Sequence, residues 1–352
     1  MNPDNFTLKV FDPKTASDAE IEAAWHFKTQ MAKESSPDDP TQSLKHFKKS
    51  LENEPSFVTI YRWSLYDTSD NSETGKIVAR VGGLIGHMEE NQHIVQGGVQ
   101  VLADYRQQGI AKYLLPKLLE VAQKHNRRLI LDDTVSTIPS GEAFAKRLGA
   151  KAGLPLHQNQ LELKTLNTDL MTDWSNRFKT ISDDFELILW EDDIPEDEIA
   201  NFCELHDVMN TAPTDDLDVE DEKLTPEQLK EYLASNKAMG IKLWLMLAKH
   251  KESNEYAGYT QLFFNPEKAH ILQQGDTAVV PKYRGHSLGK ILKAKNLAKA
   301  MEAVPKAELV RTTNAMSNEA MLNINTEMGF YAYKSIIVWE LDVDVLETYL
   351  SN

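Results

Sequence analysis

The chain has 352 residues, which is too long for one ordinary domain. Its composition, 41% hydrophobic and 26% charged, is typical of a globular protein. Its net charge of −16 and its lack of a long apolar run argue against a nucleic-acid partner and against a membrane span. The N-terminus does not resemble a secretory signal and Cys203 is the only cysteine, so no internal disulfide can form and we expect a cytoplasmic protein.

Hydrophobic periodicity predicts helices where it is close to 3.6 residues, and strands where it is close to two or where a short run is uniformly apolar. The first half of the chain alternates the two kinds of element. In order, the predicted elements are a strand at 6–8, a helix at 19–31, strands at 57–61 and 77–85, a strand ending at Val101 with a helix from Tyr113, a strand at 128–131, a further helix, and a closing strand at 161–163.

A polar stretch at 164–184, which carries Trp174 and Phe178, predicts a connecting helix. The second half then repeats the order of the first. Its predicted elements are a strand at 185–187, a helix at 196–209, strands at 243–247 and 257–264, a strand ending at Val280 with a helix from Ile291, a strand at 308–311, a further helix, and a closing strand at 339–341.

The two halves also match in sequence at a near-constant offset. Tyr105–Ala111 has a counterpart in Tyr283–Gly289, 178 residues later, and Gly149 has one in Gly329, 180 residues later. An offset close to half of the chain length indicates a duplicated domain. We therefore predict an α/β fold in three parts: an N-terminal domain at 1–165, a linker helix at 166–183 and a C-terminal domain at 184–352.

The turn between strand and helix in each half carries the most informative chemistry. The first backbone N–H groups of a helix have no intrahelical partner, and with the helix dipole they attract anions such as pyrophosphate. Glycine lets a phosphate approach the backbone, and arginine offers it a planar cationic fork. The spacing fits neither a Walker A loop nor a Rossmann fingerprint, since Gly285 and Gly289 are one residue too close and no G-x-G-x-x-G follows a first strand.

The segment Arg106–Ala111 resembles the [RQ]-x-x-G-x-[GA] signature of the GNAT (Gcn5-related N-acetyltransferase) superfamily. The resemblance extends over both halves and is closest to tandem members similar to mycothiol synthase. It implies two acyl-CoA N-acyltransferase domains, each a mixed, mostly antiparallel sheet flanked by helices. It also implies acetyl-CoA as cosubstrate, with the pyrophosphate on the turn and the pantetheine arm paired to the preceding strand.

The resemblance assigns the binding of acetyl-CoA to the same positions in both halves. These residues are Val99, Val101, Arg106, Gln107, Gln108, Gly109, Ile110 and Ala111 in the first half, and Val279, Val280, Arg284, Gly285, His286, Ser287, Leu288, Gly289, Asn314 and Asn318 in the second. His286 is open to a second interpretation, as a solvent-facing turn residue.

The sequence departs from the family pattern in two ways. Ser287 replaces the middle glycine of the second turn, so the first half, with Gly109, is the better cofactor match. Many family members carry a tyrosine four residues before the downstream glycine, as the acid that protonates the thiolate. Ala145 and Asn325 occupy those positions here and cannot donate such a proton.

Two residues of the second half are candidates for catalysis. Asp276, just before the cofactor strand, is placed to orient an amine or to relay its proton, and Tyr331 is a candidate acid. The alternatives are a solvated strand-entry carboxylate and an aromatic of the core or rim. The acidic stretch 215–222 either recognises a cationic acceptor or is a solvated loop.

We therefore predict an N-acetyltransferase, an enzyme dependent on acetyl-CoA, that acetylates an amine of a small molecule by direct transfer in a ternary complex. A cationic acceptor is one candidate for that molecule. In tandem members of the family the C-terminal domain is usually the catalyst, which favours the second half. Two alternatives stay open: a non-catalytic acetyl-CoA sensor and a protein N-acetyltransferase. We expect a monomer or homodimer, and the sequence shows no metal-binding motif.

Overall fold

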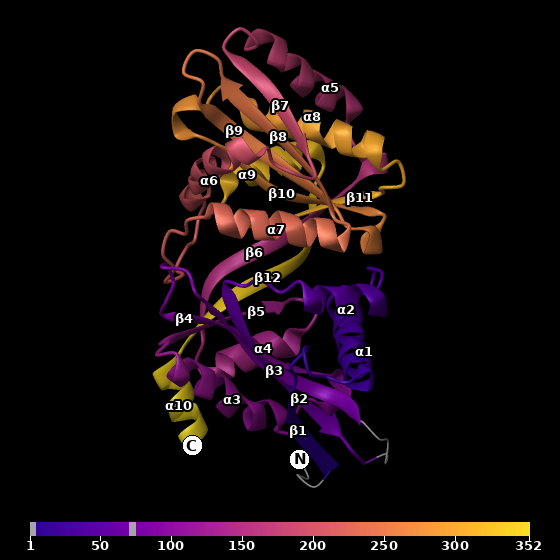
Figure 1. Cartoon of the computed structure of the whole chain (residues 1–352), viewed down its shortest axis with the longest axis vertical. Coiled ribbons are helices and arrows are strands. Elements are labelled where there is room, and N and C mark those ends of the chain that lie inside the picture. The colour runs from indigo at the N-terminus through magenta and orange to yellow at the C-terminus, as the bar shows by residue number, and fades with distance from the viewer. Residues whose placement is uncertain (1–4, 70–74) are drawn as a thin grey trace. The chain divides into compact units, whose positions relative to one another are not determined.

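The computed structural model of the chain describes residues 5–69 and 75–352, and the chain forms two compact units (Figure 1). Unit 1 consists of residues 1–155, 216–220 and 336–352, and unit 2 of residues 156–215 and 221–335. Each unit contains one mixed sheet with helices on its faces. The predicted fold class, two tandem α/β domains with mostly antiparallel sheets, is confirmed.

The sheet of unit 1 has the strand order β1-β2-β3-β4-β5-β12. All neighbours are antiparallel except β4 and β5, which are parallel. The strands span β1 Phe6–Val10, β2 Val58–Asp67, β3 Lys76–Gly86, β4 Ile94–Val101, β5 Leu129–Val135 and β12 Tyr331–Asp342.

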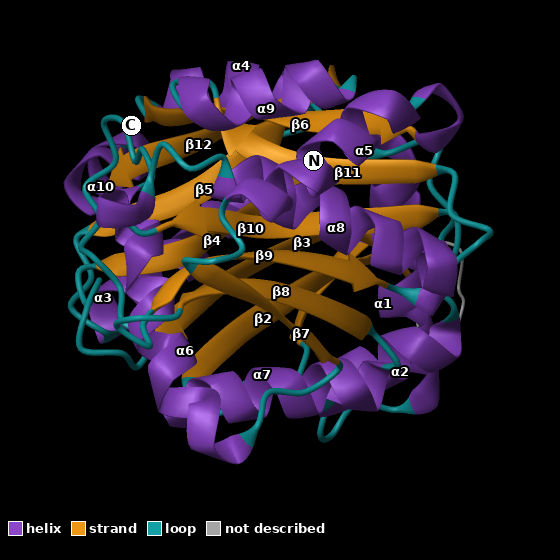
Figure 2. Ribbon diagram, turned by 90° about the horizontal axis from the view of Figure 1, so that it is seen from above, coloured by secondary structure: helices purple, strands orange, loops and turns teal. Residues whose placement is uncertain are grey.

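Helices cover both faces of this sheet. They span α1 Asp18–Ser35, α2 Leu44–Glu52, α3 Ile110–Lys124, α4 Pro139–Leu148 and α10 Val343–Ser351. One apolar cluster joins α3, α4 and α10 to the sheet, and a second joins α1 and α2 to the other face. Figure 2 shows helices on both sides of the strands. A capping box between Ser17 and Glu20 satisfies the free N–H groups that begin α1.

The sheet of unit 2 has the order β7-β8-β9-β10-β11-β6, with β10 and β11 parallel and the other neighbours antiparallel. Its strands span β6 Lys151–Glu162, β7 Phe185–Glu191, β8 Lys242–His250, β9 Tyr256–Phe264, β10 Ile271–Val279 and β11 Leu309–Ala315. Its helices span α5 Thr168–Arg177, α6 Ile199–His206, α7 Pro226–Met239, α8 Leu288–Ala303 and α9 Glu319–Met328.

The helix expected at 166–183 is α5, and it is part of unit 2. Its fully buried Trp174 belongs to an apolar cluster that includes Leu297 of α8. Helix α7 was not predicted, although Thr225 and Gln228 form a capping box at its start and Pro226 occupies its first position. In the described residues no helix has both the length and the apolar character that a membrane span requires.

The closing strand of each half completes the sheet of the other unit. Residues 336–342 of β12, yellow in Figure 1, pair with β5 in unit 1, and residues 156–162 of β6 pair with β11 in unit 2. Both strands are 12 residues long, roughly 40 Å at about 3.3 Å per residue, so each can leave one unit and enter the other. The compact units therefore differ from the sequence halves at these strands, because periodicity identifies a strand but not its partner.

Candidate functional site

Strands β4 and β5 diverge part of the way along the sheet of unit 1. They pair only where residues 94–96 face residues 129–131, although β4 continues to Val101 and β5 to Val135. In unit 2, β10 and β11 pair only where residues 271–273 face residues 309–311. Each divergence leaves backbone N–H and C=O groups of two parallel strands without a ladder partner. Such an opening suits a ligand that carries amide groups.

The turn after β4 has a distinctive backbone that recurs after β10. Gln107 and Gly109 have φ values of +60° and +83°, and Gly285 and Ser287 have φ values of +89° and +59° at the matching positions. Each half thus places one glycine and one other residue in the left-handed region, which costs a non-glycine residue about 1 kcal/mol or more. Ser287 therefore keeps the turn geometry despite replacing a glycine.

The turn leads directly into α3 in unit 1 and α8 in unit 2. Alternation of left-handed and ordinary residues points successive backbone N–H groups into one concavity, and the free N–H groups of the first helical turn add to it. A Cβ atom built on Gly109 or on Gly285 would meet no heavy atom within 4 Å. Each turn therefore has space above it for an anionic group.

The arginine of each turn is hydrogen bonded to the protein. The Nε of Arg106 donates to the carbonyl of Val101 at 2.9 Å, and its guanidinium forms a bidentate pair with Glu34 of α1. The Nε of Arg284 donates to the carbonyl of Val279 at 3.0 Å. The two arginines thus brace the turn against the end of the preceding strand, and the backbone N–H groups are the main donors left for an anion.

A cavity of about 1100 Å³ lies in unit 1 and passes between the diverging strands. It is lined from one face of the sheet by α1 and α2 and from the other by α3 and α4. Its volume exceeds the roughly 300–1000 Å³ of most small-molecule pockets. Of the first-half residues predicted to bind acetyl-CoA, the cavity is lined by Val99, Val101, Arg106, Gln107, Gly109, Ile110 and Ala111. Gln108 instead points to the carbonyl of Asp104.

Asp132 of β5 lies inside this cavity and was not predicted. Its carboxylate occupies the space above Gly98 of β4, where a Cβ atom would lie 1.7 Å from Oδ2. The side chain is exposed to the cavity, and the protein atoms around it desolvate the carboxylate. This desolvation and the charge of Asp133 raise the pKa of Asp132 to about 7. A carboxyl group that titrates near neutrality inside a cleft is suited to proton transfer.

Two glycines and Arg62 form the face of the sheet beside Asp132. Arg62 of β2 faces Gly82 of β3, and Gly82 faces Gly98 of β4, so these three positions share one face of the sheet. The two glycines have no side chains, and Arg62, Gly98 and Asp132 all line the cavity. The guanidinium of Arg62 pairs with Glu54.

The matching positions of unit 2 carry larger polar side chains. Leu115 and Ala145, which line the cavity of unit 1, correspond to Lys293 and Asn325 at the repeat offsets of 178 and 180. Lys293 is 1% exposed, its Nζ donates to Oδ1 of Asn325 at 2.8 Å, and desolvation lowers its pKa to about 7. Asn325 in turn donates to Asn314 at 2.8 Å. In unit 2, hydrogen-bonded polar side chains therefore occupy positions that line the cavity in unit 1.

The two predicted catalytic residues have separate surroundings. Oδ2 of Asp276 lies 3.7 Å from Nε2 of His206, at a position that matches Gly98 in the first half. Tyr331 is 45% exposed, and its hydroxyl accepts a hydrogen bond from Nε2 of Gln160 at 2.9 Å. No hydrogen bond joins Asp276 to Tyr331, and the structure does not bring the two into one site.

The other predicted residues of the second half have internal partners. Asn318 caps α9 by accepting a hydrogen bond from the N–H of Met321 at 3.2 Å, and Asn314 accepts from Asn325. Nδ1 of His286 lies 3.2 Å from the carbonyl of Tyr283. Among the described residues, no group of three His, Cys, Asp or Glu side chains is arranged to hold a metal ion.

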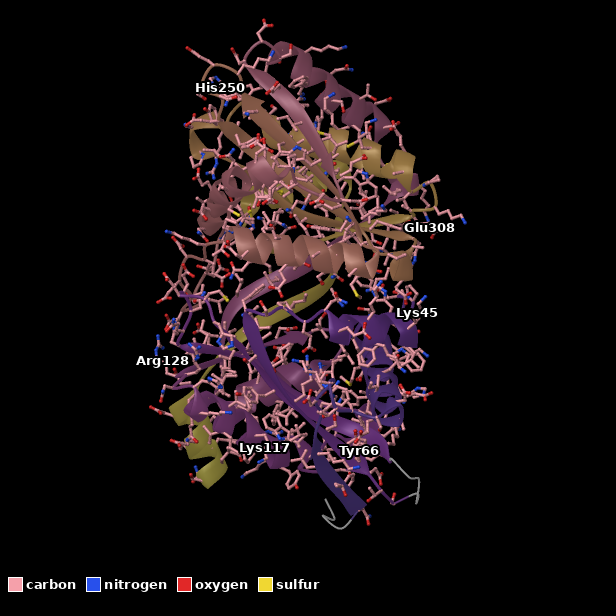
Figure 3. All side chains as sticks on the ribbon, in the orientation of Figure 1. Lys45, Tyr66, Lys117, Arg128, His250 and Glu308 are labelled. Carbon is pink, nitrogen blue, oxygen red and sulfur yellow. The ribbon has the colours of Figure 1, made fainter. Side chains whose placement is uncertain are left out.

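The middle of the acidic stretch belongs to unit 1. Oδ2 of Asp218 accepts a hydrogen bond from Arg128, labelled in Figure 3, at 2.7 Å, and this bond lowers the pKa of Asp218. Oε2 of Glu220 accepts from the N–H of Asn91 at 2.6 Å. These two carboxylates attach the loop to unit 1, which is a structural role.

A family model described as the acetyltransferase (GNAT) family matches the chain twice, over residues 23–150 and 172–330. A tandem GNAT protein from the clavulanic acid biosynthesis pathway matches with a TM-score of 0.74 and 20% identity, over 96% of this chain and 98% of that one. A GCN5-related N-acetyltransferase from Sphaerobacter thermophilus matches with a TM-score of 0.63 and 12% identity, over 97% and 96%. A search of curated proteins found no match. With two family matches and a fold shared along its whole length, the chain belongs to the GNAT family as a tandem member.

Proposed function

We propose that the protein is an N-acetyltransferase that transfers the acetyl group of acetyl-CoA to the amine of a small molecule, and that the reaction takes place in unit 1. One observation carries the proposal: a single cavity contains the anion-binding turn after β4, the unpaired edges of β4 and β5, and the carboxyl group of Asp132. These are the three parts that acetyl transfer needs, namely a phosphate site, a site for the pantetheine arm and a base.

The residues around the cavity fit coenzyme A. The backbone N–H groups of the turn and of the first turn of α3 would hold the pyrophosphate. The free N–H and C=O groups of β4 beyond Gln96 would pair with the amides of the pantetheine arm. Acetyl-CoA would supply the activated acetyl group. Asp132, ionised above its pKa of about 7, would accept a proton from the bound ammonium group and leave a nucleophilic amine.

Two features favour unit 1 over unit 2 as the place of reaction. The positions that match Leu115 and Ala145 are filled in unit 2 by Lys293 and Asn325, which bond to each other. The position that matches Asp132 is Thr312, which has no carboxyl group. The catalytic assignment to Asp276 and Tyr331 is therefore the weaker proposal.

One observation favours a second candidate function, the binding of acetyl-CoA without turnover. Ala145 occupies the position where many relatives have the tyrosine that protonates the departing thiolate, and it cannot donate a proton. A sensor of acetyl-CoA needs the cavity but not the acid. Turnover separates the two candidates, since only an enzyme releases free thiol in the presence of an amine.

Isothermal titration of acetyl-CoA into wild type, Gly109→Trp and Ser287→Trp tests the assignment to unit 1. Gly109 and Ser287 hold matching positions with left-handed backbones, and Gly109→Trp adds the cost of about 1 kcal/mol for a non-glycine residue that Ser287 already carries. We expect one site in the wild type, lost in Gly109→Trp and kept in Ser287→Trp. Loss of binding in Ser287→Trp alone would contradict the proposal, as would the absence of any binding in the wild type.

A further inference from the structure

Cationic side chains outnumber anionic ones around the cavity, although the protein as a whole is acidic. Six cationic side chains line the cavity and three anionic ones do. Arg106 and Arg62 pair with Glu34 and Glu54 respectively. Lys112 belongs to the first turn of α3, where a phosphate would bind. Lys28 contacts the ring of Phe47, and Arg147 is an exposed residue at the end of α4. The sixth cation, Arg80, lies on the α1 and α2 side of the sheet and has no assigned role.

Arg80 lies on β3 and lines the cavity. Its guanidinium carbon is 5.0 Å from the ring centre of Phe11. In the described parts of the chain no carboxylate pairs with it, and the nearby charge of Arg62 adds to the desolvation that lowers the pKa of Arg80 to about 10. Ser64 stands directly opposite on β2, and its buried hydroxyl also has no hydrogen-bond partner among the described residues.

An enclosed guanidinium without an anion is costly, since its desolvation is not offset by a charge partner. Its planar fork matches a carboxylate, which can accept two parallel N–H bonds. The phosphates of coenzyme A would bind at the turn and are not needed to neutralise Arg80. The geometry thus calls for an anionic group on a ligand that reaches the α1 and α2 side of the cavity.

We propose that the amine accepted by this enzyme is an amino acid or a similar small amino carboxylate, whose carboxylate binds Arg80 while its amine faces Asp132. The inference depends on the proposed acetyl transfer in unit 1. Arg80 faces Gln100 of β4, two residues from Gly98, above which Asp132 lies. Neighbouring strands lie about 4.8 Å apart, and successive residues along a strand lie about 3.4 Å apart. The backbones of Arg80 and Gly98, one strand and two residues apart, are therefore about 8 Å from each other. With both side chains reaching inward, one small zwitterion spans that gap.

A dicarboxylic acyl chain on coenzyme A is the other source of a carboxylate. The amino acid is favoured because Arg80 lies on β3, one strand farther from β5 than the β4 edge that would pair with the pantetheine arm. An acyl group attached to that arm starts between β4 and β5. The experiment therefore includes succinyl-CoA as a separate donor.

The test uses the full-length wild type, Arg80→Met, Arg80→Lys and, as a matched control, Arg177→Met, which removes an exposed arginine of α5. Thiol release from acetyl-CoA is measured with the twenty amino acids and with their amides, which lack the carboxylate. Binding of N-acetyl amino acids and of their amides to the CoA-saturated proteins is followed by saturation-transfer NMR, so that the readout does not depend on turnover. Titration with acetyl-CoA reports on the cofactor site.

We expect the wild type to prefer the carboxylate over its amide at least 30-fold in rate or in product binding, the range for a buried charge pair. Arg80→Met should reduce this preference to about twofold, Arg80→Lys should keep part of it, and Arg177→Met all of it, with acetyl-CoA affinity unchanged throughout. A wild type without the preference, or an Arg80→Met variant that keeps it, overturns the inference. So does an Arg80-dependent preference for succinyl-CoA with neutral amines. Loss of acetyl-CoA binding in the wild type would instead refute the proposed function.

Discussion

Replacement of Asp132 by asparagine keeps the size of the side chain and removes the proton acceptor. If Asp132 is the general base, kcat should fall by about 10²- to 10⁴-fold, the usual contribution of such a group. The wild-type kcat/KM should rise with pH up to about 7, because the carboxyl group must lose its proton before it can accept another. Asp132→Asn should lose that limb of the profile.

The same substitution should stabilise the protein above neutral pH. The folded-state pKa of Asp132 is raised from 3.8 to about 7, so the folded protein holds a proton that the unfolded chain has released. The favourable contribution of Asp132 to the free energy of unfolding is complete below pH 3.8 and is lost as the pH rises to 7. A shift of this size corresponds to about 4 kcal/mol, and the openness of the side chain to cavity water reduces it to roughly 1–2 kcal/mol.

Chemical denaturation of wild type and Asp132→Asn at pH 5 and pH 8, together with thiol-release rates across the same range, measures both effects. We expect the stability difference in favour of the variant to grow from pH 5 to pH 8, while the activity of the variant relative to wild type falls over the same range. A purely structural carboxylate would give the opposite result, with a less stable variant. Full activity of Asp132→Asn at pH 8 would refute the role of base.

Three further substitutions follow from the same contacts. Gly98→Ala places a methyl group where the Asp132 carboxylate lies, so activity should drop at least about tenfold while unfolding free energy, measured with urea, changes by under about 1 kcal/mol. Asp133→Asn removes a charge that raises the pKa of Asp132, so the limb of the pH–rate profile should move to lower pH. Lys293→Met should stabilise the protein by on the order of 2–3 kcal/mol at pH 7. The reason is that the lowered pKa of Lys293 makes the folded state less stable as the pH falls from 10.5 to 7. Denaturation should show this gain at pH 7 and no gain near pH 10.5.

The sequence was sufficient to predict the duplication and most strands, because an offset and a hydrophobic period are local patterns that the chain itself displays. It also located both turns, since glycine and arginine recur there at a fixed spacing. The left-handed conformation of Gln107 and Ser287 could not be predicted, because neither residue type requires it. Helix α10 was missed because it follows β12 without a turn signal.

The site was harder to predict than the fold because it depends on pairing between distant segments. Asp132 follows the apolar run Leu129–Leu131, which is a sign of position but not of role. Its importance comes from Gly98 on the neighbouring strand and from the divergence of β4 and β5. Nothing in the sequence marks Arg80 as a site residue, because an arginine within a strand is usually solvated. Only the strand register, which places Arg80 opposite Ser64 and Gln100, shows where it lies.

The closing strand of the second half contributes directly to the cavity of unit 1. Trp339 and Leu341 of β12 and Tyr349 of α10 belong to the second half in sequence, yet they line the cavity of unit 1. Nε1 of Trp339 donates to Oγ1 of Thr134 on β5 at 2.8 Å, and so fixes the strand that carries Asp132.

Removal of residues 336–352 should therefore abolish acetyl-CoA binding in unit 1, although every residue of its turn and its base lies in the first half. The deletion leaves the edge of β5 unpaired and opens the cavity wall, and loss of a strand of this length is expected to unfold the unit. Trp339→Phe is the milder variant, since it keeps most of the packing and removes only the hydrogen bond to Thr134. It should weaken kcat more than acetyl-CoA affinity in titration, because Thr134 is two residues from Asp132. Unchanged binding after the deletion would mean that the second half contributes nothing to the site.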